Sequence, residues 1–320
     1  MKILFITCSR IGDAVLTTGL LKEIQNRYPF ASVTVAVDPL PAALFEDYPL
    51  LDNLIIFSKK RHSKHWFDLW KKVKGQKWDW IIDMRGSLIS YTLWAKKRIV
   101  WKSKPKDTRH KVEQVSALLG AKILSPGLWF TEERFNKAKK YFQDDVYIAV
   151  APAANWVGKQ WPITSFIELF KRFIREYPGV KIAIFAAPYE KNIVDPLIQS
   201  LPKENVLSFL DQNLSLIETA ACINQCKMFI GNDSGLMHVA AAVGIPTIGL
   251  FGPSKEQNYR PWQNYDEARN TVVRTPMTYD QMSSRPGFSH KSQDCYMGSL
   301  DVETVWQALI SCIQRTCKKE

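Results

Sequence analysis

The sequence lacks the short motifs by which several large enzyme classes are identified. No Gly-x-Gly-x-x-Gly follows either opening strand, which argues against a nicotinamide-dependent enzyme. The chain also has no Gly-Lys-Ser/Thr phosphate loop, no Gly-x-Ser-x-Gly elbow, no His-Glu-x-x-His zinc motif and no Asp-x-Asp metal–diphosphate clamp. A nucleotide diphosphate would therefore have to be held by helix dipoles, backbone N–H groups and Lys159, without a required metal.

Cysteine and long apolar runs are also scarce. The six cysteines show no Cys-x-x-Cys spacing, which in a chain of 320 residues is typical of reduced thiols in a cytosolic protein. The opening apolar run is interrupted at Thr7 and closed by Arg10, unlike a signal peptide. The stretch 234–254 has no acidic or basic side chain, but its Gly-Pro turns indicate a helix, a turn and a buried strand. We expect a cytoplasmic protein without a transmembrane span.

The composition is that of a globular protein with an uneven charge. Apolar residues make up 46% of the chain and charged residues 23%, which excludes low complexity and bulk disorder. The formal net charge is +12, and residues 1–143 hold 26 basic against 13 acidic side chains, whereas residues 144–320 hold 17 against 18. The window 59–111 alone holds 17 basic and 4 acidic side chains. The same window contains six tryptophans: Trp66, Trp70, Trp78, Trp80, Trp94 and Trp101.

A basic, Trp-rich face suits a polyanionic partner at an aqueous or membrane interface. The alternative is a solvated surface whose tryptophans belong to the core. Nucleic acid would also be attracted electrostatically, but the chain shows no helix-turn-helix or RNA-binding signature, so we expect no nucleic-acid partner.

Apolar runs alternating with helical patterns predict parallel sheets flanked by helices. The length predicts two domains of roughly 150 residues. In the first half we expect strands at Lys2–Thr7, Val33–Val37, Leu54–Phe57 and Trp80–Asp83, and helices at Ala14–Arg27 and Trp66–Lys74. In the second half we expect strands at Val146–Val150, Val180–Ala186, Val206–Leu207, Met228–Gly231 and Thr247–Phe251, and helices at Thr164–Glu176, Glu190–Ser200, Leu214–Cys226, Ser234–Val243 and Val302–Arg315.

The predicted fold class is α/β, with two doubly wound domains facing each other across a cleft. The acidic linker Gln143-Asp144-Asp145 divides the chain into domains at 1–143 and 144–300, followed by a C-terminal helix at 301–320. Residues 254–297 are expected to form long surface loops. Ligands of such sheets bind outside the carboxyl ends of the strands.

The strongest local signal is Phe229-Ile-Gly-Asn-Asp-Ser-Gly-Leu-Met-His238. A strand ends at Gly231 and a helix opens at Asp233-Ser234-Gly235, so that backbone N–H groups and the helix dipole make an anion site. Gly235 has no Cβ and lets an anion approach closely. The alternatives are an ordinary Asp or Ser N-cap and, for His238, a packed or capping histidine.

Two further segments carry charged residues at strand ends. In the loop Ala151–Pro162, Lys159 precedes a helix start and could neutralise a diphosphate leaving group, although a single exposed lysine is the commoner case. In Arg10-Ile-Gly-Asp13, the aspartate could act as a general base or could simply cap the following helix.

These segments, in this order, resemble glycosyltransferase family nine, the bacterial lipopolysaccharide heptosyltransferases. The family's Gly-Asp and Thr-rich helix appears as Ile11-Gly12-Asp13-Ala-Val-Leu-Thr17-Thr18, and its Lys-x-Trp-Pro element as Lys159-Gln-Trp-Pro162. Its Asp-Thr/Ser-Gly-x-x-His element appears as Asp233-Ser-Gly-Leu-Met-His238, followed by Phe251-Gly-Pro-Ser254. Two further segments match the family pattern more weakly: Trp78-Asp-Trp-Ile-Ile-Asp-Met-Arg-Gly-Ser87 and Cys295-Tyr-Met297.

The resemblance implies the GT-B architecture, with an acceptor-binding first domain and a donor-binding second domain. It implies an inverting, metal-independent enzyme that moves heptose from ADP-heptose to the lipopolysaccharide inner core, the anionic Kdo–lipid A glycolipid at the cytoplasmic face of the inner membrane. Such an enzyme needs no cofactor and associates with that membrane peripherally.

The resemblance also assigns roles to individual residues. Asp13 would deprotonate the acceptor hydroxyl, and Lys159 would stabilise the departing ADP. Glu190 would hold the ribose hydroxyls. The remaining donor-side positions are Asn155, Asp233, Ser234, Gly235 and His238. The acceptor-side positions are Arg10, Gly12 and Arg85.

Two departures from the family pattern touch the donor pocket. Ala151-Pro-Ala-Ala154 replaces a glycine-containing turn, and Ala186-Ala187 replaces glycines near Glu190. A relative that uses another sugar nucleotide, with a hexose or hexosamine, is therefore one alternative. A non-catalytic binder of acidic glycolipid with the same fold is another.

Overall fold

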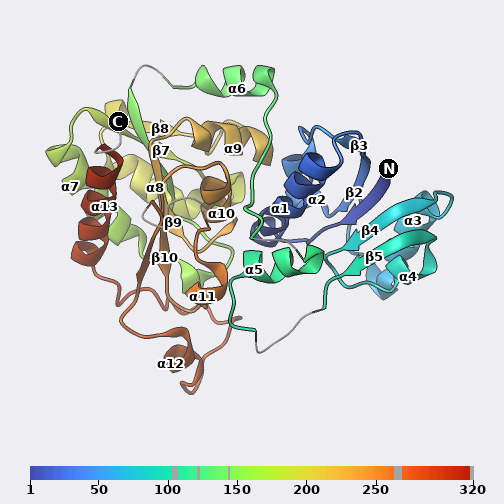
Figure 1. Ribbon diagram of the computed structural model, residues 1–320. Helices are drawn as coiled ribbons and strands as arrows, with labels where there is room; N and C mark the ends of the chain where they lie inside the picture. The colour runs from blue at the N-terminus through green and yellow to red at the C-terminus, as the bar shows by residue number, and fades with distance from the viewer. Residues whose placement is uncertain (103–106, 121–122, 143–144, 263–268, 318–320) are drawn as a thin grey trace. The chain divides into compact units, whose positions relative to one another are not determined.

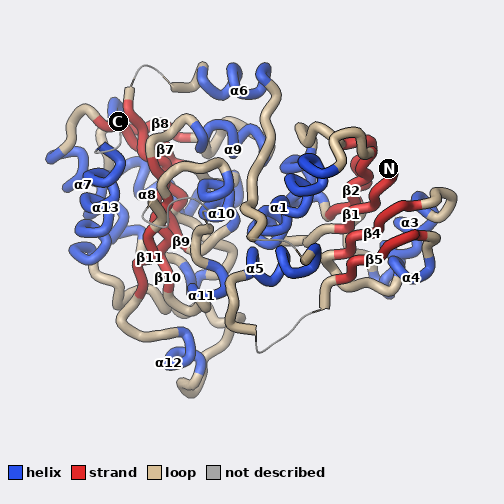
Figure 2. The backbone as a smooth tube through the Cα atoms, viewed as in Figure 1, coloured by secondary structure: helices blue, strands red, loops and turns tan. Residues whose placement is uncertain are grey.

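The computed structural model describes residues 1–102, 107–120, 123–142, 145–262 and 269–317. Its packing divides the chain into two compact units, Met1–Thr131 and Glu132–Glu320. Each unit contains a parallel β-sheet with helices beside it (Figures 1 and 2). The predicted α/β class with two sheets is therefore confirmed.

The first unit is built on a five-stranded sheet in the order β3-β2-β1-β4-β5, with every neighbouring pair parallel. Numbered along the chain, this is the doubly wound order 3-2-1-4-5. The strands are β1 (Lys2–Ile6), β2 (Ser32–Val37), β3 (Leu51–Ile56), β4 (Trp78–Asp83) and β5 (Ala95–Val100). The helices are α1 (Ile11–Arg27), α2 (Pro39–Ala42), α3 (Lys64–Val73), α4 (Ile89–Thr92) and α5 (Lys111–Ser116).

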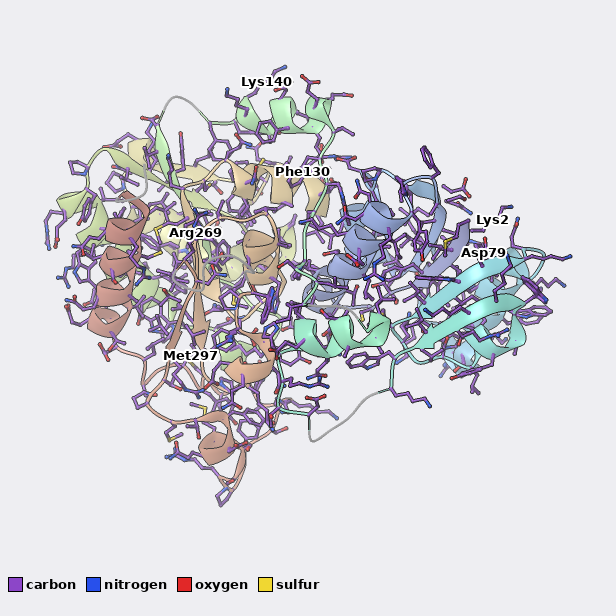
Figure 3. All side chains as sticks on the ribbon, in the orientation of Figure 1. Lys2, Asp79, Phe130, Lys140, Arg269 and Met297 are labelled. Atoms are coloured by element: carbon purple, nitrogen blue, oxygen red, sulfur yellow. The ribbon has the colours of Figure 1, made fainter. Side chains whose placement is uncertain are left out.

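The central strand β1 is buried along Ile3–Ile6 because helices cover both faces of a parallel sheet. Where β1 begins, its first backbone N–H, that of Lys2, donates to the Asp79 carboxylate of β4 at 2.7 Å (Figure 3). Where β1 ends, the Thr7 hydroxyl lies 3.1 Å from the buried Thr17 hydroxyl of α1. The threonine-rich start of α1 thus holds the helix against the carboxyl end of β1.

The second unit is built on a six-stranded parallel sheet in the order β11-β10-β9-β6-β7-β8. Read from β8 and numbered along the unit, this is the order 3-2-1-4-5-6 of dinucleotide-binding folds. The strands are β6 (Val146–Ala151), β7 (Val180–Ile184), β8 (Val206–Ser208), β9 (Met228–Asn232), β10 (Thr247–Phe251) and β11 (Thr271–Arg274). The helices are α6 (Glu132–Lys139), α7 (Ile163–Glu176), α8 (Lys191–Ser200), α9 (Leu216–Asn224), α10 (Gly235–Ala242), α11 (Glu256–Tyr259), α12 (Tyr279–Ser283) and α13 (Val302–Cys317).

The core of the second unit is aromatic. Phe166, Phe170 and Phe173 recur on the inner face of α7 and are fully buried, and Trp306 of α13 packs against Phe173. Trp161, just before α7, packs edge-on against Phe166. This cluster fixes the start of α7, and with it the loop that leaves β6.

The structure corrects several predicted elements. Residues 254–297 are not only surface loops, because they include β11, which extends the sheet beside β10, and the short helices α11 and α12. The edge strand β5 was not predicted. Its sequence AKKRIV lacks the apolar run or apolar–polar alternation of a strand, because three of its side chains are exposed cations.

The division between the units falls twelve residues before the predicted linker. Residues 143 and 144 of that linker lie outside the described part of the chain. Helix α6 groups with the second unit, where the Lys137 ammonium lies 2.6 Å from the Glu218 carboxylate of α9. That ion pair and the backbone N–H of Ser215 hold the pKa of Glu218 at about 2.

Candidate functional site

The candidate donor site lies where the strand order of the second sheet reverses. In doubly wound sheets, ligands bind outside the carboxyl ends of the strands at this reversal. Here it falls between β6 and β9, which pair in parallel up to Ala151 and Gly231. The loop after β6 carries Asn155 and Lys159, and the loop after β9 carries Asp233 and Ser234.

The structure brings three predicted residues of these loops together. The Lys159 ammonium lies 2.5 Å from one carboxylate oxygen of Asp233, and His238 Nε2 lies 4.0 Å from the other. The Asp233 side chain is only 7% exposed, whereas that of Lys159 is 25% exposed. Asp233 therefore holds a cation that keeps part of its surface toward solvent.

The loop that carries Lys159 is fixed by the side chain of Asn232, the last residue of β9. Asn232 is fully buried, and its amide donates to the Pro152 carbonyl at 2.7 Å while its oxygen accepts from the Trp161 N–H at 3.0 Å. Lys159 ends a single 3₁₀ turn between these two anchors. Within that turn a Cβ on Gly158 would lie 2.5 Å from the Trp156 ring, so only glycine fits.

The start of α10 offers unused hydrogen-bonding groups. Ser234 occupies the N-cap in an extended conformation, as one alternative predicted, but its side chain makes no capping hydrogen bond. Its hydroxyl is buried and has no partner among the described residues. The first-turn N–H groups of a helix lack intrahelical acceptors and carry the positive end of the dipole. This helix start, beside Lys159 and Asp233, can therefore bind an anion.

Glu190 and Asn155 lie at the same edge of the sheet without a hydrogen bond to the Lys159–Asp233 pair. Glu190 ends the loop after β7, the strand beside β6, and its carboxylate accepts from the Ala187 N–H at 2.8 Å. Burial raises the pKa of Glu190 above its ordinary value. A carboxylate kept partly dehydrated at a strand end is typical of a ligand-binding site. Asn155 is exposed.

In the first unit the strand order reverses between β1 and β4, and the acceptor-side candidates follow these strands. Arg10 is the exposed N-cap of α1, and its side chain makes no capping hydrogen bond. Gly12 and Asp13 belong to the first turn of α1. The half-buried Asp13 carboxylate accepts no hydrogen bond from any described residue, so the alternative that Asp13 caps the helix is not observed.

Arg85 follows β4 and is held on several sides. Its guanidinium lies 2.5 Å from the Asp38 carboxylate, and its centre is 4.8 Å from the Trp66 ring. The fully buried Asp83 carboxylate accepts from the backbone N–H groups of Arg85 and Ser87, both at 2.8 Å. Asp83 thus shapes the turn, and Asp38 and Trp66 orient the cation.

Sequence reasoning missed Lys111, the first residue of α5. Its ammonium lies 3.5 Å from the centre of the Trp101 ring, and burial lowers its pKa while the nearby Asp13 carboxylate acts in the opposite direction. Burial and the same carboxylate raise the pKa of the Cys8 thiol to about 12, so Cys8 is neutral at physiological pH. In sequence, Lys111 is one of 17 basic residues in its window, and nothing marks it.

The described part of the chain has neither a metal-binding cluster nor a membrane-spanning helix. Within these ranges, no three His, Cys, Asp or Glu side chains gather in a way that could hold a metal ion. None of the helices described is both long and apolar enough to cross a bilayer.

Comparison with known families gives the family of the chain. The model of "Glycosyltransferase family 9 (heptosyltransferase)" matches residues 101–282, more than half of the sequence. The chain belongs to glycosyltransferase family 9. It is therefore a glycosyltransferase, and the resemblance inferred from its motifs is confirmed.

Individual relatives support the same family. The chain is 25% identical over 320 aligned residues to lipooligosaccharide heptosyltransferase 2 of Haemophilus influenzae, covering 86% of this chain and 88% of that protein. Among solved structures, E. coli ADP-heptose lipopolysaccharide heptosyltransferase II superposes with a TM-score of 0.76 at 21% identity, covering 98% and 99% of the two chains. E. coli heptosyltransferase WaaC with ADP superposes with a TM-score of 0.72 at 17% identity, covering 98% and 100%. The predicted GT-B architecture is thus confirmed.

The anchoring role of Asn232 can be tested by Asn232→Ala. Two buried backbone groups, the Pro152 carbonyl and the Trp161 N–H, then lose their partner, and we expect a loss of about 2 kcal/mol in the free energy of unfolding. Hydrogen exchange should accelerate in the segment 152–162. Asn224→Ala, which removes a single bond to the Val243 carbonyl, is the control and should leave that segment protected. Equal exchange in both variants would contradict the anchoring role.

Proposed function

We propose that this chain is an inverting, metal-independent transferase that moves heptose from ADP-heptose to the lipopolysaccharide inner core. The observation that carries the proposal is the Lys159–Asp233 pair, which sets a cation beside the start of α10 at the reversal of the second sheet. Family membership gives the reaction class, and the names of the comparison structures support the donor and acceptor classes that we propose.

The donor diphosphate would bind at the start of α10. Lys159 supplies a fixed positive charge next to Asp233, and Ser234 and Gly235, which follow Asp233 at the start of α10, would supply backbone N–H groups. When the bond from the anomeric carbon to the diphosphate breaks, negative charge grows on the departing ADP. Donors that are already in place stabilise this charge without reorganising, which lowers the barrier. His238, beside Asp233, would complete this end of the site.

The nucleoside would bind farther along the same edge, where β7 ends. The Glu190 carboxylate, which already accepts one backbone hydrogen bond, has a second oxygen for the ribose hydroxyls. Asn155, in the loop after β6, would contact the donor from the side of Lys159. ADP in the comparison structure of WaaC supports adenosine as the nucleoside.

Asp13 would act as the general base. Inversion by direct displacement requires one carboxylate to take the acceptor proton while the acceptor oxygen attacks the anomeric carbon and ADP leaves. Asp13 fits this role because no described residue donates a hydrogen bond to its carboxylate, which leaves both oxygens able to accept that proton. The Lys111 ammonium, which interacts electrostatically with this carboxylate, supplies a positive charge near it.

The acceptor would be an anionic glycolipid, Kdo–lipid A of the inner core. Arg10 and Arg85 lie at the carboxyl edge of the first sheet with Gly12, and their positive charges suit acidic sugars and phosphates. Such an acceptor is anchored in the cytoplasmic leaflet of the inner membrane. We therefore place the enzyme in the cytoplasm, in peripheral contact with that membrane.

A different sugar nucleotide is the second candidate donor. Ala153 and Ala154, in the loop before Lys159, are both buried, where the family pattern has a glycine-containing turn. Ala186 and Ala187 stand before Glu190 in place of glycines. Their methyl groups add volume along the edge that would hold the donor, which favours a test of several nucleotides.

The donor base can be identified by thermal stabilisation with ADP, UDP, GDP and CMP. A ligand present at 100 times its Kd adds about 2.7 kcal/mol to the free energy of unfolding, so the preferred base should stand out in the melting temperature. We expect ADP to give the largest shift. A larger shift with UDP or GDP would overturn the ADP-heptose assignment and favour the second candidate.

The general base can be tested with Asp13→Asn. The amide keeps the size of the side chain but cannot take a proton, so turnover should fall about 10²–10⁴-fold. ADP affinity should not change, because the donor site belongs to the other unit. Asp52→Asn, an exposed aspartate of β3, is the matched control and should retain full turnover. Normal turnover by Asp13→Asn would exclude Asp13 as the base. Glycolipid binding by a wild-type chain that shows no turnover would instead favour the non-catalytic binder.

Glu190→Gln should improve stability and weaken donor binding. Because burial raises the pKa of Glu190 above its ordinary value of 4.5, the native state resists its ionisation, and the charge costs stability as the pH rises above that value. The amide removes this cost, so the variant should melt higher at neutral pH but not below pH 4.5. Losing a charged acceptor for the ribose should weaken ADP binding about tenfold. Glu204→Gln, which changes an exposed side chain, is the control and should alter neither the melting temperature nor the ADP affinity. Unaltered ADP affinity in Glu190→Gln would exclude Glu190 from the donor site.

A further inference from the structure

The outer face of α3 carries a ladder of aromatic rings and lysines. Its members are Phe67, Trp70, Lys71 and Lys74, spaced so that they share one side of the helix. The two rings stack with centroids 5.9 Å apart and planes 12° from parallel. The Lys71 and Lys74 ammonium groups each lie 4.5 Å from a ring centroid, over Phe67 and Trp70 respectively. We call these four residues the aromatic–lysine face.

Phe67 of this face is not required by the core, whereas Trp70 is partly buried and packs against it. The opposite side of α3 packs on the sheet through His65, Leu69 and Val73, which are all buried. Phe67 is 56% exposed, although burying a phenylalanine is strongly favourable. Packing within the first unit therefore leaves a large apolar side chain in water.

Helix α4 adds further exposed apolar residues. Ile89 and Leu93 join the same hydrophobic cluster as Leu69 and Val73 of α3, so both helices cover one side of the sheet (Figure 1). Around α4, three large side chains are more than half exposed: Leu88 at 82%, Tyr91 at 56% and Trp94 at 52%. We call these three residues the α4 rim.

The charge around both features is strongly positive. Residues 59–102 contain thirteen basic and three acidic side chains. Two of the acids are neutralised locally, Asp68 by Lys60 at 2.7 Å and Asp79 by Lys96 at 2.6 Å, and the third, Asp83, is fully buried. The lysines of the aromatic–lysine face therefore present their charge without a compensating acid on that face.

We propose that the aromatic–lysine face and the α4 rim dock the first unit on an anionic phospholipid bilayer. The rings and Leu88 would enter the interfacial layer, while the lysines lie along them and reach the lipid phosphates. Nucleic acid would account for the lysines but not for an exposed leucine. A bilayer uses both signals, since stable peripheral binding needs apolar contact as well as charge.

The position of α3 connects this surface to the acceptor side. Trp66, the neighbour of Phe67, lies 4.8 Å from the Arg85 guanidinium at the carboxyl edge of the sheet. A bilayer bound along α3 would thus lie next to the residues that we assign to acceptor binding. Only the identity of the membrane rests on the proposed function. The docking surface itself follows from the exposed apolar side chains and the positive charge of the aromatic–lysine face and the α4 rim.

Sedimentation with vesicles tests the docking surface. The probes are vesicles of phosphatidylglycerol and phosphatidylethanolamine in equal parts, and vesicles of phosphatidylcholine alone. The wild-type chain should bind the anionic vesicles and not the neutral ones. Lys71→Gln with Lys74→Gln should weaken binding about 25-fold, since each lysine near an anionic surface contributes about fivefold. Lys171→Gln with Lys203→Gln, which removes the same charge from the second unit, should bind as wild type.

A second pair of variants tests the apolar contribution. Phe67→Ser with Leu88→Ser should reduce binding to anionic vesicles at low and at raised salt, because it removes the contact that salt does not screen. Phe30→Ser is the matched control, since Phe30 is 95% exposed on the same unit outside this surface. The side chains of Phe67, Leu88 and Phe30 are all exposed, and the melting temperature of each variant shows that it has folded.

The outcomes separate this inference from the proposed function. Turnover with a deacylated, water-soluble acceptor and ADP binding should be unchanged in the Phe67 and Lys71 variants. Vesicle binding without any transfer from a sugar nucleotide would reject the function and retain the docking surface. Unaltered vesicle binding in both variant pairs, or equal binding to neutral vesicles, would overturn the docking surface. The docking surface would also be overturned by two results together: an oligonucleotide displaces the vesicles, and vesicle binding does not depend on Phe67 and Leu88.

Discussion

The buried amide of Asn232 is the interaction on which the donor side of this molecule depends. Where β6 and β9 end, the chain leaves the sheet in two loops, and their backbone groups lose their ladder partners. Asn232 satisfies one donor and one acceptor of the β6 loop at once, the Trp161 N–H and the Pro152 carbonyl. An aspartate could not donate to the carbonyl, and an apolar residue could do neither. The strand end therefore specifies the residue type.

The two sheets use the same device at their reversal points. In the second unit a carboxylate that follows one strand, Asp233, holds Lys159 from the neighbouring loop. In the first unit Asp38, after β2, holds Arg85, after β4. Partly buried ion pairs contribute little net stability because both ions lose hydration. Their presence at both edges is better explained by the need to keep a cation oriented where an anionic ligand binds.

Asp13 differs from these paired carboxylates in its environment. Asp83, Asp38 and Asp233 each have a hydrogen-bond donor or a cation in contact. Asp13 has neither among the described residues, although the Lys111 ammonium interacts with it electrostatically. A carboxylate that must take up and release a proton is hindered by strong fixed donors. The contrast with the paired carboxylates of both units thus singles out Asp13 for proton transfer.

Much of this arrangement could be predicted from the sequence, and the exceptions have physical causes. Buried central strands such as β1 and β10 are continuous apolar runs. Asp233 follows β9 directly, and Lys159 and Asp13 lie in the segments that leave β6 and β1. Edge strand β5 was missed because three of its side chains are exposed, and β11 because it has four residues of which only one is fully buried, so both lack a strong apolar signal. The roles of Lys111 and Asn232 depend on contacts between segments far apart in the chain, such as Asn232 with Pro152, and no local pattern encodes them.

The charge of the first unit exceeds what its sheet edge can use. Arg10, Arg85 and Lys111 lie at or near that edge, and Asp38 already neutralises Arg85, yet the window 59–102 holds thirteen basic residues. Most of these lie on α3 and β5 or in the segments beside them. A field of this strength draws the unit toward any polyanion, but it does not select an orientation. Exposed rings do select one, because apolar contact is short-ranged and confined to the face that carries them. The stacking of Lys71 and Lys74 on Phe67 and Trp70 combines long-range attraction and short-range orientation on a single helix. Trp66, which precedes Phe67 on that helix, contacts the guanidinium of Arg85 at the sheet edge.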